Sequence, residues 1–319
     1  MRVVCIDGER QYRDLVLRDV GAVLEGEGHS LDWFEERFAD RDAAIARASG
    51  YDALLVIGDQ GPVPAGLLRS NRSIRLVSFV GTGARRFVDM QEAAETGAAV
   101  TNVPDFASDS VAEHAIALMF AVARRIPEGD RLIRNGEWIK NKGLKLQGRQ
   151  LGVVGAGAIG SRVIARAKAL GMQPVYWNRT TSVEREAALG ARYMDLDDLF
   201  RTSSVVSLHL AQTEGTSGLI GRDLLDLLAT DAILVNTSRA EVTDTGYLFQ
   251  LLRQGSLFGA GLDVFDTEPP DLATLPLGVP NLVLTPHIGF HTDEADGVFR
   301  AAADNIVAFA AGQPRNVLS

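Results

Sequence analysis

The fold of this 319-residue chain is decided by one stretch, Leu151-Gly152-Val153-Val154-Gly155-Ala156-Gly157-Ala158-Ile159-Gly160. A strand-like apolar run leads into a Gly-x-Gly-x-x-Gly pattern, and a segment of helical spacing follows. In this context Gly155 permits a tight turn, Gly157 lets a pyrophosphate approach the backbone, and Gly160 allows close packing of helix on strand. The stretch predicts a dinucleotide-binding turn. The competing interpretation is a glycine-rich turn without a ligand.

The helix that begins within this stretch would supply further phosphate contacts. Amides at a helix N-terminus lack intrahelical acceptors and lie at the positive end of the helix dipole. We therefore include Ala158 and Ile159 among the predicted cofactor contacts.

Around this turn, β-rich runs alternate with helical segments, which is typical of a doubly wound parallel sheet. The predicted strands after residue 150 are 151–154, 174–178, 205–210, 232–235, 259–265 and 281–285. The predicted helices between them are 159–170, 184–189, 223–228 and 245–253. Four weaker strand candidates precede them, at 2–7, 53–58, 75–80 and 99–103. The chain is thus predicted to be an α/β protein of two domains, a Rossmann-type domain and a smaller α/β domain.

The connection between the two domains is predicted to be helical. Ser110-Val111-Ala112-Glu113 reads as a capping box, with Ser110 as the N-cap of an apolar helix that ends near Ala123. Residues 301–312 also have helical spacing and are expected to return to the first domain. We expect residues 1–101 and 288–319 to form the smaller domain and residues 102–287 to form the nucleotide-binding domain.

Composition excludes several classes of partner. The net charge is −9, and the Lys and Arg residues are scattered, so neither a nucleic acid nor an anionic membrane is an expected partner. Cys5 is the single cysteine, which suits a reducing compartment, and no apolar run reaches bilayer length. We therefore expect a cytoplasmic protein. No metal site is expected, because His287 and His291 are separated by a glycine and do not share a helix face.

The end of the second Rossmann strand bears on the choice of cofactor. Asn178 lies where an NAD enzyme usually has an acidic residue for the ribose hydroxyls. Arg179 could pair with a 2′-phosphate, and Asn178 and Thr180 could donate hydrogen bonds to it. The sequence therefore favours NADP over NAD, although a solvated surface arginine would look the same.

Three candidate catalytic residues follow successive predicted strands: Arg239, Glu268 and His287. Ligands bind at the carboxyl ends of strands in open parallel sheets, so these side chains are expected to converge. Hydride addition to a 2-keto acid needs a proton donor, for which His287 is suited, while Glu268 would orient the imidazole. Arg239 would bind the substrate carboxylate. Each residue alone could instead be structural: an ion pair, a loop acid and a loop histidine.

These motifs make the chain resemble the D-isomer-specific 2-hydroxyacid dehydrogenase family over nearly its whole length. The matching segments are 236–244, 262–269 and 285–289, with Gly81-Thr82-Gly83 and Val111-Ala112-Glu113-His114 upstream. The resemblance implies a flavodoxin-like fold for the smaller domain and a catalytic role for Arg239, Glu268 and His287.

The resemblance also implies ligand contacts beyond the glycine loop. It places His209, Thr216, Thr237 and Asp263 at the cofactor, with Asp263 on the nicotinamide carboxamide. The substrate would bind the amides of Gly81, Thr82 and Gly83, which agrees with the anion-binding geometry of consecutive backbone amides. An ordinary turn after a strand is the alternative there.

The family implies a homodimer built through the nucleotide-binding domain, with the helix near residues 111–124 at the interface. Simple packing of that apolar helix inside the chain is the alternative.

Two small departures and one larger departure from the family pattern stand out. Ala240 replaces the usual glycine after the arginine, and Ala211 replaces a common proline. Asn178-Arg179 is the departure that puts strict NAD use in doubt.

The predicted reaction is hydride transfer between NAD(P)H, with NADPH favoured, and a 2-keto acid or D-2-hydroxy acid, as in glyoxylate and hydroxypyruvate reductases. A cofactor-sensing binding protein of the corepressor type, with little turnover, is the alternative function. Oxidation of formate or phosphite is a further enzyme class in the family. The loop Ile57-Gly58-Asp59-Gln60 could face the substrate side chain, or it could be an ordinary surface loop.

Overall fold

The computed structural model describes residues 1–58, 61–279, 281–293 and 296–318. Asp59 and Gln60, half of the loop considered above for the substrate side chain, lie outside the described residues. The chain divides into two compact units. Unit 1 comprises Met1–Phe106 and Asp293–Ser319, and unit 2 comprises Ala107–Thr292.

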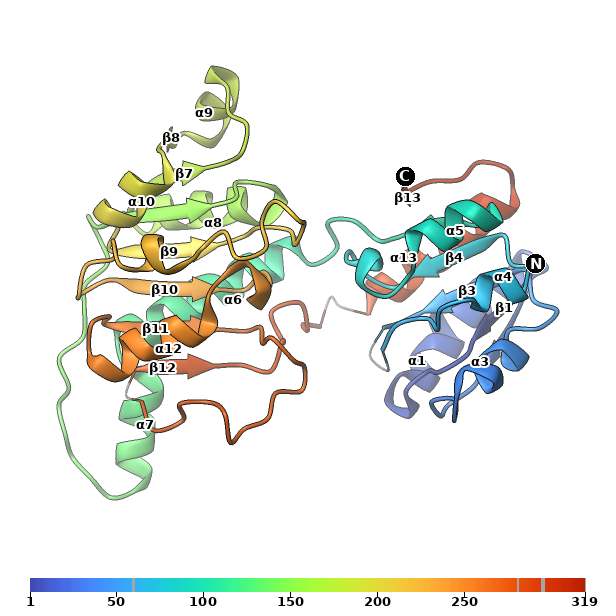
Figure 1. Cartoon of the computed structure of the whole chain (residues 1–319), viewed down its shortest axis with the longest axis horizontal. Helices are drawn as coiled ribbons and strands as arrows, with labels where there is room; N and C mark the ends of the chain where they lie inside the picture. Colours follow the sequence, from blue (N-terminus) through green and yellow to red (C-terminus); the bar gives the residue numbers. More distant parts are fainter. Residues whose placement is uncertain (59–60, 280, 294–295, 319) are drawn as a thin grey trace. The chain divides into compact units, whose positions relative to one another are not determined.

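Unit 2 is built on a seven-stranded parallel sheet of order β12-β11-β10-β9-β6-β7-β8 (Figure 1). This is the Rossmann order, in which the first strand, β6, lies at the point where the chain reverses its direction across the sheet. The strands are β6 Gln150–Val154, β7 Gln173–Trp177, β8 Arg192–Tyr193, β9 Val205–Leu208, β10 Ile233–Asn236, β11 Gly259–Leu262 and β12 Leu282–Leu284. The fold class predicted from the alternating pattern is confirmed.

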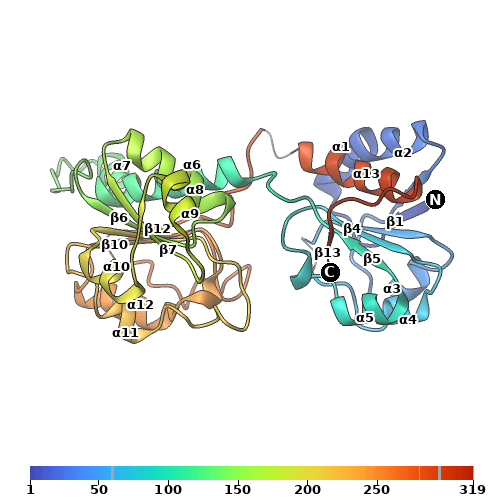
Figure 2. The same ribbon diagram turned by 90° about the horizontal axis from the view of Figure 1, so that it is seen from above.

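Helices cover both faces of this sheet (Figure 2). They are α6 Ser108–Ala123, α7 Ile126–Arg134, α8 Ala158–Ala169, α9 Val183–Leu189, α10 Leu196–Thr202, α11 Arg222–Leu225, η4 Ala240–Val242 and α12 Thr245–Gln254. One core joins α6 and α8 to the sheet, and a second core joins α10, α11 and α12 to its other face. Strands covered on both faces are mostly apolar, and β9 and β10 are buried at every residue.

Unit 1 has a six-stranded sheet of order β13-β5-β4-β3-β1-β2, in which only β13 is antiparallel among the described strands. The strands are β1 Arg2–Cys5, β2 Ser30–Trp33, β3 Ala53–Val56, β4 Leu76–Phe79, β5 Ala99–Thr101 and β13 Val317–Leu318. The order 2-1-3-4-5 of the first five is the flavodoxin-like arrangement.

The helices of unit 1 also form two layers (Figure 2). They are η1 Arg10–Tyr12, α1 Arg13–Val16, η2 Leu17–Gly21, α2 Ala22–Gly26, α3 Arg41–Arg47, α4 Leu67–Ser70, η3 Ala84–Arg86, α5 Met90–Thr96 and α13 Gly297–Ala310. Helix α13 packs its buried Phe299 and Ile306 into the core beneath β4. The predicted return of the C-terminal helix to the first domain is therefore correct.

The structure corrects two details. Ser110 is not an N-cap: α6 begins at Ser108, the Ser110 hydroxyl donates to the Ala107 carbonyl, and Glu113 pairs with Arg166. The chain passes from unit 1 to unit 2 after residue 106 and returns to unit 1 after residue 292, whereas the predicted boundaries follow residues 101 and 287. The later return to unit 1 has a physical cause. Hydrogen bonds to Asp263 hold the amides of Ile288 and Gly289 in unit 2.

Among the residues that the structure describes, no helix is both long enough and apolar enough to cross a membrane.

Candidate active site

The glycine loop between β6 and α8 has the tight geometry that the pattern predicts. Gly155 has φ of +96°, and a Cβ there would press against the backbone of His209. A Cβ on Gly160 would collide with the Gly155 carbonyl oxygen. At the N-cap of α8, by contrast, no described atom beyond Gly157 and its chain neighbours lies within 4 Å of where a Cβ of Gly157 would be. The loop thus leaves open space at the helix N-terminus, where an anion is stabilised.

Asn178 holds this loop in place from the end of the neighbouring strand. The Ala156 amide donates to Asn178 Oδ1 at 2.7 Å, and the Gly155 amide donates to the Trp177 carbonyl at 2.9 Å. Asn178 is half-buried, whereas Arg179 and Thr180 are exposed. The asparagine therefore has a structural function that sequence reasoning did not anticipate, and the two following side chains face solvent.

Two buried polar atoms that directly follow the neighbouring strands β9 and β10 suit a bound ligand. Among the described residues, neither His209 Nδ1 nor Thr237 Oγ1 has a hydrogen-bond partner. Leaving a buried polar atom unpaired is costly, so such atoms commonly mark the place of a missing molecule. Together with the open space at Gly157, they fit a nicotinamide dinucleotide.

His209 is neutral in this environment. Burial lowers its pKa to about 3, and its Nε2 lies 2.8 Å from Ser207 Oγ. An uncharged imidazole can offer a donor or an acceptor to a ligand at no electrostatic cost.

The predicted catalytic residues follow three adjacent strands whose ends are level. In the parallel register, Asn236 of β10 lies beside Leu262 of β11, which lies beside Leu284 of β12. Arg239, Asp263 and Thr285 therefore begin their loops at one edge of the sheet. Such an edge is where open α/β sheets bind ligands.

The loop that carries Arg239 is held by hydrogen bonds to a single asparagine side chain. Asn236 Oδ1 accepts from the Ser238 amide and hydroxyl, both at 2.9 Å, and its Nδ2 donates to the Arg239 carbonyl. The Arg239 guanidinium is half-buried and donates to the Ser238 carbonyl at 2.6 Å. Ala240, the departure from the family glycine, is helical and buried in η4, so this position does not require a left-handed backbone.

His287 and Glu268 form the hydrogen-bonded pair that the sequence predicts. His287 Nδ1 lies 2.9 Å from Glu268 Oε2, and Glu268 Oε1 accepts from the Phe265 amide at 3.1 Å. His287 has φ of +53°, an uncommon conformation for a non-glycine residue that often marks a functional site. The imidazole is thus oriented by a carboxylate and held on a constrained turn.

Asp263 lies beneath this turn and is 2% exposed. Its Oδ1 accepts from the Thr285 hydroxyl at 2.6 Å and from the Ile288 amide at 2.9 Å, and its Oδ2 accepts from the Gly289 amide at 2.8 Å. Burial raises the pKa of Asp263, but hydrogen bonds from His114, Thr285, Gly289 and Ile288 outweigh it and hold the pKa below its usual range. Asp263 is therefore ionised and already accepts several protein donors.

Comparison with known proteins identifies the family to which the chain belongs. Residues 116–289 match the family model for the NAD-binding domain of D-isomer specific 2-hydroxyacid dehydrogenases. The chain belongs to that family.

Named relatives extend the likeness to both units. The glyoxylate reductase of Thermococcus litoralis is 38% identical over 90% of this chain and 89% of its own length. The D-3-phosphoglycerate dehydrogenase of Archaeoglobus fulgidus is 35% identical over 88% of this chain and 53% of its own. The NADPH-dependent glyoxylate/hydroxypyruvate reductase of Sinorhizobium meliloti, solved with citrate, has a TM-score of 0.86, 27% identity, and coverage of 100% of this chain and 97% of its own.

In this dehydrogenase the predicted cofactor residue Thr216 makes hydrogen bonds within its own loop. Its hydroxyl lies 2.7 Å from the Ala211 carbonyl and 2.8 Å from the Thr213 amide. These bonds shape the segment where the family commonly has a proline, so the structure gives Thr216 a local role.

The predicted substrate loop lies in unit 1, after β4. The Gly81 carbonyl accepts from the Val103 amide at 2.8 Å, and the Thr82 carbonyl accepts from Asn102 Nδ2 at 2.8 Å. Both carbonyls are thereby held by the end of β5, an arrangement that suits a loop offering its amides to an anion.

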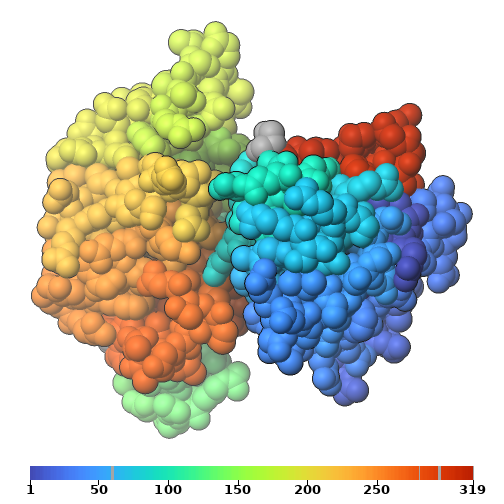
Figure 3. Space-filling model, turned by 45° about the vertical axis from the view of Figure 1, so that its right-hand side comes forward, coloured from blue at the N-terminus to red at the C-terminus, as the bar shows by residue number. Residues whose placement is uncertain are grey.

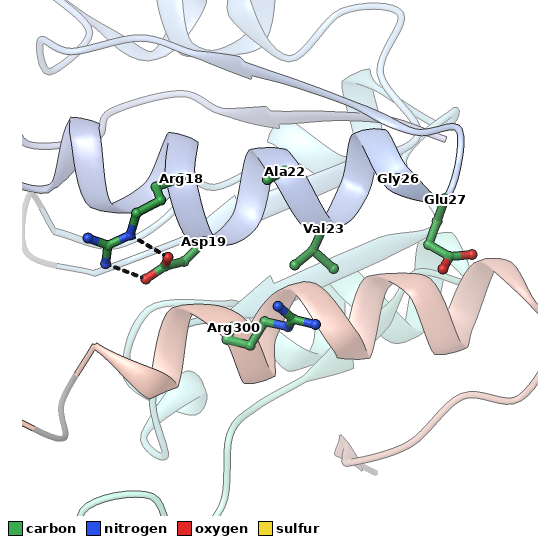
Figure 4. A pocket seen from close by; sticks show the side chains of 7 residues that line it. All are labelled: Arg18, Asp19, Ala22, Val23, Gly26, Glu27 and Arg300. Atoms are coloured by element: carbon green, nitrogen blue, oxygen red, sulfur yellow. Dashed lines mark hydrogen bonds and ion pairs between the residues drawn. The ribbon is translucent and has the colours of Figure 1, made fainter.

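A surface hollow of about 320 Å³ between α2 and α13 is separate from these loops (Figure 4). Three of its charged lining side chains are paired: Arg18 makes two hydrogen bonds to Asp19, at 2.6 and 2.8 Å, and Arg300 pairs with Asp304, which lies outside the lining. We assign no ligand to it.

Proposed function

We propose that this dehydrogenase reduces a 2-keto acid of the glyoxylate or hydroxypyruvate type to the D-2-hydroxy acid. The observation that carries the proposal is the His287–Glu268 pair, which lies at the same sheet edge as Arg239. The bound nicotinamide would supply the hydride. The names of the relatives, glyoxylate reductase above all, support the same substrate class.

The proton for the new hydroxyl group comes from His287. A carboxylate can only accept hydrogen bonds, so the contact with Glu268 places a hydrogen on Nδ1. The imidazolium form also carries a hydrogen on Nε2, and this nitrogen donates its proton to the carbonyl oxygen as negative charge develops there, which leaves a neutral imidazole. Glu268 stabilises the imidazolium form and fixes the plane of the ring.

Arg239 binds the substrate carboxylate in this proposal. Its guanidinium offers paired donors that match the two oxygens of a carboxylate, and its loop is fixed by Asn236. In unit 1, the amides of Gly81, Thr82 and Gly83 are proposed as substrate-binding donors that suit a carboxylate.

We propose NADPH as the preferred reductant. Asn178 is neutral where an acidic side chain would repel a 2′-phosphate, and the exposed Arg179 and Thr180 follow it directly. Gly155, Gly157, Ala158, Ile159 and Gly160 would hold the pyrophosphate, and His209, Thr216, Thr237 and Asp263 would contact the rest of the cofactor.

The enzyme is further proposed to be a homodimer. The buried face of α6 is covered within unit 2, so the interface would use the other face of α6 together with α7. Four large apolar side chains on α7 and just after it are exposed: Ile126, Ile133, Trp138 and Ile139. The green atoms of this segment project from the lower edge of unit 2 in Figure 3. Apolar patches of this kind commonly mark protein interfaces.

Light scattering coupled to size exclusion tests this assembly. We expect the mass of a dimer for the unsubstituted chain and of a monomer for Ile133→Asp/Trp138→Asp. Val183→Asp, at an exposed apolar residue on α9, is the matched control. A monomeric unsubstituted chain would reject the proposal.

Initial rates with NADH and NADPH across a panel of 2-keto acids test the proposed reaction. We expect turnover of glyoxylate or hydroxypyruvate, with a higher kcat/KM for NADPH. Tight cofactor binding with turnover near zero for every acid would instead favour the corepressor-type alternative.

A further inference from the structure

His114, in the first half of α6, lies against the loop that carries His287. Its Nε2 is 2.9 Å from Thr285 Oγ1 and 3.3 Å from Asp263 Oδ1. The His114 side chain is 18% exposed and the Asp263 side chain 2% exposed. An imidazole from a distant part of the sequence thus joins the network beneath the catalytic turn.

The direction of each hydrogen bond in this network follows from the number of hydrogens available. Asp263 is ionised and can only accept, so the single hydroxyl hydrogen of Thr285 points to it. Thr285 Oγ1 must then accept from His114, which requires a hydrogen on Nε2. The order of donation is His114 to Thr285 to Asp263.

Asp263 in turn fixes the two residues that follow His287. It accepts from the amides of Ile288 and Gly289, one on each carboxylate oxygen. A Cβ on Gly289 would lie 2.9 Å from Asp263 Oδ2 and 3.4 Å from the His114 ring, so the turn packs directly on both side chains. The left-handed conformation of His287 is maintained by these contacts and by Glu268.

We propose that His114 is a positioning residue for hydride transfer: through Thr285 and Asp263 it holds the His287 turn in its productive conformation. The inference rests on the reductase activity proposed above. It assigns to α6 a function in the reaction that does not depend on its apolar packing.

Steady-state kinetics of matched variants test this role. His114→Leu removes the donor, and His114→Gln keeps an N–H at a similar distance from the backbone. We expect kcat to fall roughly tenfold in His114→Leu, because small misplacements of a catalytic group are costly. His114→Gln should recover most of the rate. Thr285→Val should match His114→Leu, and the double variant should be no slower than either one.

Hydrogen exchange supplies a measurement that does not depend on activity. The amides of Ile288 and Gly289 should exchange about tenfold faster in His114→Leu and Thr285→Val than in the unsubstituted protein, and near the normal rate in His114→Gln. Unchanged exchange in His114→Leu, or a kcat within twofold of normal, would overturn the inference, as would additive losses in the double variant.

Failure of the proposed function would give a different result. If the unsubstituted enzyme turns over no 2-keto acid, the proposed reaction is rejected. The exchange rates then decide the positioning role alone.

Discussion

The two ends of the ligand-facing sheet edge in unit 2 are built in opposite ways. At the ends of β11 and β12, Asp263, Glu268 and His287 are each held by short hydrogen bonds and are wholly or partly buried. At the end of β7, Asn178 is bonded to the glycine loop, but Arg179 and Thr180 are exposed. One end is fixed by its contacts, and the other is defined mainly by charge.

This difference matches what each end is proposed to do. Proton transfer depends on distances of a few tenths of an ångström, so its groups must be held from several directions. Discrimination of a 2′-phosphate depends chiefly on the sign of nearby charge, which acts over longer distances. We therefore expect substitutions at the first end to reduce the rate and substitutions at the second to change the choice of cofactor.

The largest effect is expected from His287→Ala. Loss of the proton donor should lower kcat by roughly 10²–10⁴-fold. Fluorescence titration should find the affinity for NADPH nearly unchanged. A kcat close to that of the unsubstituted enzyme would remove His287 from the mechanism.

A smaller loss is expected from Glu268→Gln. The amide keeps the size of the side chain but no longer stabilises an imidazolium by charge, so kcat for reduction should fall by roughly 10–100-fold. The measurement is the rate at saturating cofactor and keto acid. Asp271→Asn, at a loop carboxylate that hydrogen-bonds only its own turn among the described residues, is a control that should keep full activity. Equal rates for both variants would contradict an orienting role of Glu268.

At the other end, Asn178→Asp should reverse the cofactor preference. A carboxylate can still accept from the Ala156 amide, so the glycine loop stays in place, while its charge repels a 2′-phosphate. We expect kcat/KM for NADPH to fall at least about tenfold relative to that for NADH. Arg179→Ala should weaken NADPH selectively while changing the free energy of unfolding by less than about 0.5 kcal/mol. Parallel changes for both cofactors would reject 2′-phosphate recognition here.

His209 follows β9, between the two regions. Because its pKa is lowered by burial, we expect the free energy of unfolding to depend on pH. Its pKa is about 3 when folded and 6.5 when exposed, so below pH 6.5 the unfolded chain binds a proton that the folded chain does not. The free energy of unfolding should therefore fall with falling pH, by roughly 1.4 kcal/mol at pH 5.5 from this residue alone. Urea unfolding of the cofactor-free protein, compared with His209→Gln, isolates this contribution. Identical pH dependence of the two proteins would contradict it.

Much of the fold could be predicted from the sequence because its signals are local. The glycine loop, the apolar strands of unit 2 and the helix that ends at Gly255 all have patterns within a few residues. The strands that were missed, β2, β8 and β13, are short or partly exposed edge segments, where burial does not impose an apolar pattern.

The sequence predicts those parts of the site whose residues have a characteristic chemistry of their own, but not the contacts between distant residues. Arg239, Glu268 and His287 could be proposed from their positions after strands, and the structure brings the last two into contact. The contact of His114 with Thr285 joins residues 171 positions apart, and it exists only because α6 packs across β11. The use of Asn178 to hold the glycine loop also depends on sheet register, which no local pattern reveals.

Unit 1 is formed by two segments that flank unit 2 in the sequence, and this division determines the order in which the two units can complete folding during synthesis. During synthesis, unit 2 is complete once Thr292 has left the ribosome, whereas unit 1 still lacks α13 and the buried side chains of Phe299 and Ile306. The earlier strands of unit 1 must therefore wait, with part of their apolar surface uncovered, until the last helix emerges. The unit that is begun first is the one that finishes folding last.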